Sequence, residues 1–313
     1  RAARGGGKVS DQLQPVVSLR ATGRSRRRMR VNNVAELASI LAALIAVGFL
    51  AILVGSVLVR AFHALNWDFF TKGPAVFGAT GGGIAPALIG TLMLVLIATA
   101  IALPIGVLIA LYVSEFAPVR AGNQIKLWLG VLNGFPSIVI GIFVFVLAVK
   151  TKIPGIGIGH HQSVFAGSFA LSILMLPLVS RTTMEVLALV PNSLREASYA
   201  LGVSKWRTVV SVILPTAIGG IITGTTLAVA RAAGETAPLL FTCAIAGQIV
   251  NWNPALSSAS IPVTIFQYSE SPDPNLNAQA WAAAFVLIAF VLLTSLVSRL
   301  LLERSRRKLT SAG

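Results

Sequence analysis

Long intervals without a charged side chain constrain this chain more than any other feature. They occupy residues 37–59, 73–114, 127–149, 153–180, 208–230, 236–269 and 274–298. About 20 consecutive apolar residues are enough for a helix to cross a bilayer. Charged residues make up only 11% of the chain, whereas a soluble domain usually carries about 25%. A water-soluble fold would therefore lack charged groups to cover its surface, and the sequence predicts a polytopic membrane protein.

Two of these intervals include loops. Residues 247–262 are rich in Asn, Pro and Ser, and residues 73–86 are rich in Gly and Pro, which is typical of loop structure. We therefore predict an all-α fold with six transmembrane helices, at about residues 34–59, 87–113, 127–149, 164–181, 212–244 and 279–302.

The distribution of positive charge predicts the orientation. With both termini in the cytoplasm, twenty of the 25 Lys and Arg residues lie inside, four lie outside, and Arg231 lies within the membrane. Residues 1–33 are then a basic cytoplasmic tail, expected to be disordered, residues 34–302 the transmembrane domain, and residues 303–313 a C-terminal cytoplasmic tail. The basic run at residues 24–30 is also typical of nucleic-acid or anionic-lipid binding, but we interpret it as a topology signal.

The cytoplasmic loop at residues 182–214 is too long for a tight turn. Ser193 and Glu196 fit a capping box, which predicts a helix beginning at residue 194. Gly202 can adopt the left-handed conformation that ends such a helix, and Ser204 can cap a second helix running to Pro215. A DNA-binding helix-turn-helix has the same pattern, but the flanking transmembrane helices and the few basic residues argue against it.

The fifth predicted helix carries two charges inside the membrane. Arg231 is sixteen residues beyond Pro215, about 24 Å along a helix. Glu235 lies on the same helical face and can partly neutralise Arg231. One interpretation is a structural ion pair; the other is an anion site, because a guanidinium offers paired donors to phosphate oxygens. Arg181, at the cytoplasmic end of the fourth helix, is a second candidate contact for the anion.

Three residues are candidate helix breaks. Gly234 and Pro238 flank the charged pair, and Pro136 interrupts the third predicted helix. A break near Arg231 would free backbone N–H groups to meet an anion, as in discontinuous transporter helices.

The loop residues resemble a known family motif. Glu196-Ala197-Ser198, then Gly202, then nine residues and Val212-Ile213-Leu214-Pro215 are similar to the EAA-xxx-G-x9-I-x-L-P loop of ABC importer permeases. Ser198 replaces Ala and Val212 replaces Ile. The resemblance implies a type I importer permease fold, in which this loop forms a coupling helix that docks on an ATPase subunit. A merely connecting loop would explain the caps but not the whole pattern.

Other stretches resemble the permeases of bacterial phosphate importers. They lie at residues 133–141, 176–183, 194–202, 234–242 and 261–266, and the resemblance covers roughly residues 85–300. It implies ATP-driven import of inorganic phosphate across the bacterial plasma (inner) membrane. It also implies three partners: a second permease subunit, a dimer of ATPase subunits, and an external phosphate-binding protein.

No cofactor is expected in this chain. It has no GxxxxGK[ST] phosphate loop, so ATP and Mg are expected in the partner ATPase and the chain is not expected to be an enzyme. Its three His residues and single Cys243 have no ligand spacing that would predict a metal site.

Two alternatives stay open. Within the same class, the chain could carry another oxyanion or an organophosphate. From a different class, it could be an ion-coupled secondary anion transporter or an anion channel, which would need no coupling loop.

Overall fold

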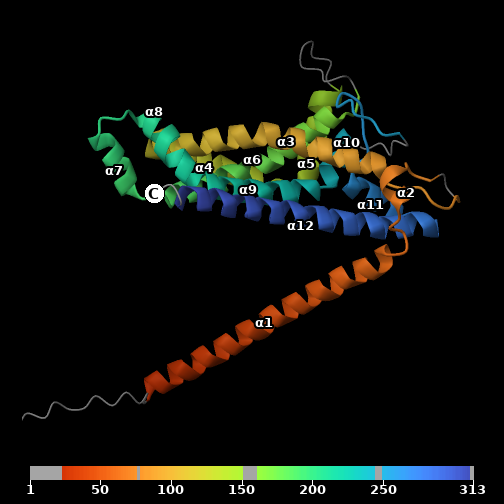
Figure 1. Cartoon of the computed structure of the whole chain (residues 1–313), viewed down its shortest axis with the longest axis horizontal. Coiled ribbons are helices and arrows are strands. Elements are labelled where there is room, and N and C mark those ends of the chain that lie inside the picture. The colour runs from red at the N-terminus through yellow and green to blue at the C-terminus, as the bar shows by residue number, and fades with distance from the viewer. Residues whose placement is uncertain (1–22, 76–77, 151–160, 244–248, 311–313) are drawn as a thin grey trace, which may run out of the picture. The chain divides into compact units, whose positions relative to one another are not determined.

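The computed structural model describes residues 23–75, 78–150, 161–243 and 249–310 (Figure 1). The chain forms two units, residues 1–54 and residues 55–313. The predictions for residues 1–22 and 311–313 of the two tails lie outside the described residues.

The described part of the first unit is one apolar helix. α1 spans Arg24–Ala61, and its stretch Arg27–Ala61 has a mean hydropathy of 2.9, enough to cross a membrane. The helix begins at Arg24 rather than at the predicted residue 34. Residues 24–30 contain Arg, Ser and Met without Gly or Pro, and Arg and Met are good helix formers. The predicted disordered tail is therefore wrong for residues 24–33.

Four long helices form the body of the second unit: α3 (Ala85–Leu111), α6 (Val164–Ala188), α9 (Leu214–Ala233) and α12 (Pro274–Thr310). α6 is the central helix. In its most apolar stretch of 18 residues, 61% of the residues are buried, whereas the corresponding fraction in α12 is 17%. α3 and α9 pack against α6 through small residues that include Ala98, Ala102 and Ala228. Small side chains let the helix backbones approach closely, as in other membrane bundles.

The third predicted span is bent. It consists of α4 (Val119–Gly134) and α5 (Ser137–Val144), which meet at 95°, and η2 (Phe145–Lys150) continues it. The span predicted at residues 127–149 is therefore two helices, which meet at the candidate break Pro136. Pro136 has no N–H to donate and holds Phe135 in an extended conformation (φ −67°, ψ 134°), which ends α4.

The fifth predicted span, residues 212–244, is also divided. A continuous helical stretch runs from Lys205 to Ala233 and consists of α8 (Lys205–Thr208), η3 (Val209–Ile213) and α9. A short helix, α10 (Ala237–Thr242), follows after a break. The helix thus begins earlier and ends earlier than predicted, because Ser204 starts it and Gly234 stops it.

Two other helices are longer than predicted. α6 continues past residue 181 to Ala188, and α12 spans Pro274–Thr310 instead of residues 279–302. By length and composition, five helices of the described residues could cross a membrane, or six when the bent α4–α5 pair counts as one span. The latter number agrees with the six predicted helices.

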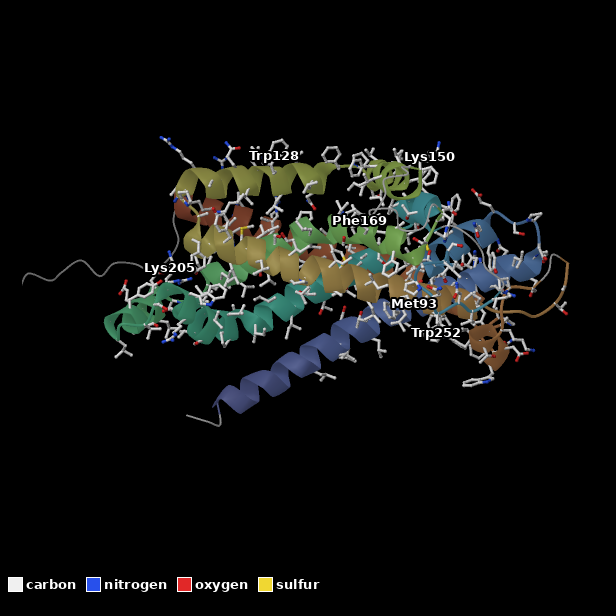
Figure 2. All side chains as sticks on the ribbon, turned by 90° about the horizontal axis from the view of Figure 1, so that it is seen from above. Met93, Trp128, Lys150, Phe169, Lys205 and Trp252 are labelled. Atoms are coloured by element: carbon white, nitrogen blue, oxygen red, sulfur yellow. The ribbon has the colours of Figure 1, made fainter. Side chains whose placement is uncertain are left out.

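The two ends of the bundle differ in structure. α7 (Asn192–Ala200) and α8 lie at one end, and α2 (Trp67–Thr71) and α11 (Ile261–Ser269) lie at the other (Figure 1). Lys205 and Lys150 mark these opposite ends when the bundle is seen from above (Figure 2). We call them the α7 end and the α11 end.

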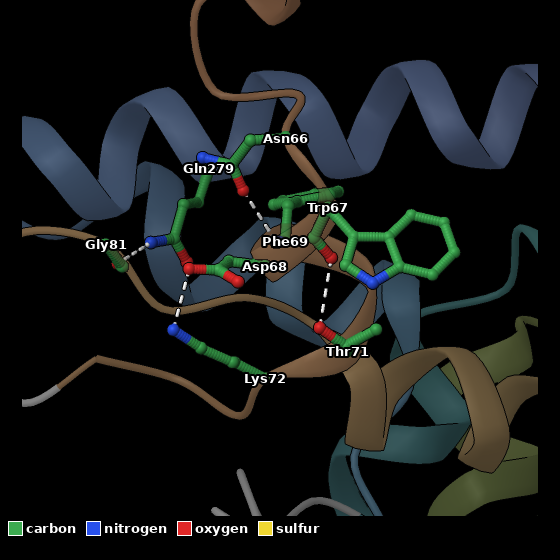
Figure 3. Close-up of polar contacts among 8 residues, drawn as sticks. All are labelled: Asn66, Trp67, Asp68, Phe69, Thr71, Lys72, Gly81 and Gln279. Carbon is green, nitrogen blue, oxygen red and sulfur yellow. Dashed lines mark hydrogen bonds and ion pairs between the residues drawn. The ribbon is translucent and has the colours of Figure 1, made fainter.

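Polar contacts hold the glycine-rich loop at the α11 end. Gln279 donates to the Gly81 carbonyl at 2.6 Å, and Asn66 caps α2 by accepting from Phe69 N–H at 2.8 Å (Figure 3). The backbone N–H groups of Gly78 and Asn275 donate to Asp273 and lower the pKa of its carboxyl below the ordinary value. The start of α12 and the loop before α3 are therefore one connected structure.

Candidate functional site

The first candidate site is α7, in the loop that carries the EAA-like residues. α6 ends at Ala188, and Pro191 precedes the first turn of α7 without a side-chain cap. Ser193 therefore lies inside the helix, and the predicted capping box between Ser193 and Glu196 is wrong. Pro191 (φ −59°, ψ 139°) starts the helix two residues early, because a proline can stand just before a first turn whose N–H groups are unpaired in any case.

Gly202 ends α7 in the conformation that the sequence predicts for it. Its φ is 74°, in the left-handed region that favours glycine. Val203 N–H donates to the Ser198 carbonyl at 3.1 Å, and Gly202 N–H donates to the Tyr199 carbonyl at 2.9 Å. These two bonds form a Schellman motif, which fixes the angle between α7 and α8.

One narrow stripe of α7 is in contact with the rest of the chain. Ser198 is buried, and its hydroxyl lies 2.8 Å from the Thr208 hydroxyl of α8. Arg195, which sequence reasoning did not select, lies on the same stripe and points into the bundle. Glu196 and Ala197 are exposed, as are three apolar side chains: Leu194 (39%), Tyr199 (42%) and Leu201 (83%). The outward side of α7 therefore offers a mixed apolar and charged surface.

Pro215 lies at the junction of η3 and α9. It is in the first turn of α9, and Leu214 N–H bonds to the Val209 carbonyl in the π-helical pattern. A proline ring clashes with the carbonyl four residues before it, and a π turn relieves that clash. Pro215 therefore does not end the helix, which continues to Ala233.

The second candidate site is the break after α9. The helix ends at Ala233, and Gly234 N–H and Glu235 N–H bond back to the carbonyls of Arg231 and Ala232 at 3.1 and 3.2 Å. α10 begins at Ala237, with Pro238 in its first turn, where the missing N–H costs nothing. The break thus spans Gly234 to Thr236.

Arg231 and Glu235 are close but loosely paired at this break. Arg231 Nε lies 3.8 Å from Glu235 Oε1, and the two side chains are 51% and 18% exposed. At that distance there is an ion pair but no hydrogen bond. Within the described part of the chain, the guanidinium therefore keeps its donors free for another acceptor.

Arg181 does not join this pair. It is exposed on α6, and its Nη2 lies against Gly130 of α4. Because Val186 packs on Gly220 and Thr182 packs on Gly224, α6 and α9 are antiparallel and Arg181 stands level with residue 225. Arg181 and Arg231 are thus about 9 Å apart along the helix pair.

A cavity of about 460 Å³ lies between α6, α9 and α12, and its lining includes Thr182, the residue that follows Arg181. Its lining includes Glu185 and four hydroxyl side chains, those of Thr182, Thr223, Thr226 and Ser295. Among the described residues, no group of three or more His, Cys, Asp or Glu side chains could hold a metal ion. Val186, Leu227 and two glycines complete the lining, and the threonine hydroxyls donate to carbonyls of their own helices. The cavity is therefore largely apolar, with one carboxylate.

The segments that follow the two breaks pack against each other. Gly141 of α5 faces Pro238 of α10, and a Cβ at residue 141 would lie 2.5 Å from the Pro238 Cα. Ile140 and Val144 of α5 are buried, as is Leu239 of α10. Each broken helix thus covers the other, which a membrane bundle requires wherever a helix is interrupted.

This contact predicts that Gly141→Ala destabilises the protein. The added methyl group would meet backbone rather than a flexible side chain, and such overpacking costs about 1–3 kcal/mol. The thermal unfolding midpoint of the detergent-solubilised protein should fall. Gly55→Ala is the matched control, because no atom lies within 4 Å of its added Cβ and its higher helix propensity should be neutral or stabilising. Equal midpoints for the two variants would contradict the close contact of α5 and α10.

The family model and the similar proteins found by comparison agree on one family. A family model described as "Binding-protein-dependent transport system inner membrane component" matches residues 102–309. The chain is 41% identical to the phosphate transport system permease protein PstA of Haemophilus influenzae, over 80% of this chain and 86% of that protein. It is 34% identical to PstA of Yersinia pestis (89% and 92% covered) and 36% identical to PstA 1 of Mycobacterium tuberculosis (96% and 96%).

Solved structures with a similar fold are ABC transporters. A bacterial alginate ABC transporter in complex with an alginate-bound periplasmic protein matches with a TM-score of 0.59 at 15% identity, covering 91% of this chain and 96% of that one. The inward-facing MetNI methionine ABC transporter matches with a TM-score of 0.53 at 18% identity, covering 71% and 94%. At these identities the likeness concerns the fold.

Proposed function

Because the chain belongs to the family of binding-protein-dependent transport system inner membrane components and is of the PstA type, we propose that it carries inorganic phosphate through an ATP-driven importer. It is a transport subunit rather than an enzyme. The observation that carries the proposal is its similarity to phosphate transport system permeases of three genera over most of their length.

The proposal includes a bacterial inner-membrane complex with three kinds of partner. A second, PstC-like permease would complete the pathway, two PstB-like ATPase subunits would bind ATP and Mg, and a PstS-like external protein would deliver phosphate. Both termini and the α7 end would face the cytoplasm. Lys205 and Arg207 at the α7 end support this orientation, because positive residues are retained on the cytoplasmic side.

In this proposal α7 is the coupling helix. Its outward side carries Leu194, Tyr199 and Glu196, which are free to enter a groove on an ATPase subunit. Its inward side is fixed by Arg195 and Ser198. A short rigid helix held on one side can pass the motion of a partner to the helices behind it.

The Arg231 site would provide the anion contact within the membrane. A charged side chain at this depth is costly and is usually functional. Arg231 is half exposed and makes no hydrogen bond in the described chain, so its guanidinium is available to phosphate oxygens. Arg181, about 9 Å from Arg231 along the helix pair, would follow on the way to the cytoplasm.

Reconstitution of the four-part complex in vesicles tests the proposed function. With binding protein outside and ATP inside, we expect uptake of labelled phosphate that requires both, with little competition from excess sulfate or molybdate. ATP-independent uptake by this chain alone would favour a secondary transporter. Equal competition by sulfate or molybdate would favour a different oxyanion as the substrate.

Arg231→Ala should abolish uptake while the complex stays assembled. A hydrogen bond to a charged group contributes about 1.5–3 kcal/mol, so the loss should be at least about tenfold. Arg120→Ala is the matched control, because Arg120 is an exposed arginine at the start of α4. If the subunits dissociate in Arg231→Ala, the structural ion-pair interpretation is correct and the anion contact is not.

Gly202→Val should uncouple transport without preventing membrane insertion. A valine at a φ of 74° costs about 1–3 kcal/mol, so the turn after α7 should be lost. ATP-dependent phosphate uptake should fall, whereas the amount of chain in the membrane should not. Gly202→Asn is the control, since Asn tolerates this conformation. Normal uptake by the valine variant would refute the coupling role of the loop.

A further inference from the structure

Arg195 of α7 makes four polar contacts with three parts of the chain. Its Nη2 donates to Glu115 Oε1 at 2.8 Å and to the Leu187 carbonyl at 3.1 Å. Its Nη1 donates to the Val190 carbonyl at 2.7 Å and to Asn192 Oδ1 at 3.2 Å. Glu115 belongs to η1 (Tyr112–Phe116), the π turn that ends the α3 rod, and Leu187 lies in the last turn of α6. One guanidinium thus joins α7, α6 and α3.

The ion pair is nearly closed to solvent. The side chain of Arg195 is 16% exposed and that of Glu115 is 6% exposed. Leu187 and Val190 are buried in an apolar cluster with Ala110 and Leu111 of α3. Charge-assisted hydrogen bonds are strong and directional in such surroundings. The planar guanidinium also places its donors in a fixed fork, which a lysine could not reproduce.

The remaining attachment of α7 leads to a different helix. Ser198 contacts Thr208 at the start of the α8–α9 rod, and the other residues of α7 are exposed. Arg195 is therefore the polar link from α7 to α3 and α6, while Ser198 is the link to α9. α3 and α6 contribute Leu94, Leu171 and Val179 to a buried core that α9 also joins through Ala228 and Ala232, so Arg195 gives α7 a direct polar connection to two of the helices of that core.

We propose that Arg195 and Glu115 are positioning residues that transmit the motion of the coupling helix into α3 and α6. The proposal rests on the proposed function, since it assumes an ATPase that moves α7. In this mechanism the ion pair between Arg195 and Glu115 stays formed during transport. As a result, α7 and the α7 ends of α3 and α6 move as one body. Without the pair, ATP hydrolysis would displace α7 with the α8–α9 rod, to which Ser198 still links it, but not with α3 and α6.

The test compares ATP hydrolysis with phosphate uptake in the same vesicles. Glu115→Gln keeps the size and one acceptor of the side chain but removes its charge. The reconstituted complex should still assemble and hydrolyse ATP, while the phosphate taken up per ATP should fall about tenfold. Arg195→Gln should lower the phosphate taken up per ATP by the same factor. The double variant should lower it no further than either single variant, because the two residues act as a unit. Glu270→Gln, an exposed carboxylate at the α11 end, should match the unaltered complex.

Several outcomes would overturn the proposal. An unchanged ratio of uptake to hydrolysis in both single variants would do so. So would uptake and hydrolysis that fall together in proportion to the amount of assembled complex. Loss of assembly in both Glu115→Gln and the charge-retaining Glu115→Asp would assign the pair to folding alone. If the unaltered complex takes up no phosphate, it is the proposed function that fails.

Discussion

The cost of an unpaired backbone group in hydrocarbon governs this fold. Each such group costs several kcal/mol, so a membrane-spanning helix can be broken only where protein covers the break. Both breaks satisfy this requirement. Gly234 and Glu235 bond back to the last turn of α9, Leu239 bonds to the Thr236 carbonyl, and α5 and α10 meet at Gly141. The two interruptions are therefore mutually dependent, which explains why they lie in the same part of the bundle.

The two ion pairs of the bundle, Arg195 with Glu115 and Arg231 with Glu235, differ in how far the chain itself satisfies the arginine. Arg195 is 16% exposed, and its two Nη atoms together make four hydrogen bonds, so it has little capacity left for a ligand. Arg231 is 51% exposed and has one contact at 3.8 Å. An arginine saturated by its own chain stabilises a joint, whereas an unsaturated one is available to an anion. Exposure and the number of hydrogen bonds thus distinguish the two arginines, although each has a nearby glutamate.

The sequence predicts the spans and the residues at which two of them break, but not the size of the breaks. Charge-free runs locate the helices because a charge inside hydrocarbon is costly over a whole helical length. Pro136 is identifiable as a candidate break, but a proline alone does not distinguish a small kink from the 95° bend, which depends on α10 being available to cover α5. The capping box at Ser193 fails because Pro191 starts α7 earlier. Arg195 and Glu115 are 80 positions apart, and no local pattern relates them; only the packing of α6 against α3 brings them together.

The two anchors of α7 connect it to different helices. Ser198 reaches the rod that runs without interruption from Lys205 to Ala233, and Arg231 lies about 39 Å along that rod. Arg195 reaches α3 and α6 instead. Val186 and Thr182 of α6 fit against Gly220 and Gly224 of α9, and a buried cluster that includes Leu187, Ile213 and Ala217 joins the same two helices, so α6 and α9 pack closely where they meet. The continuous helix from Lys205 to Ala233 thus connects the α7 end of the bundle to the break beside Arg231.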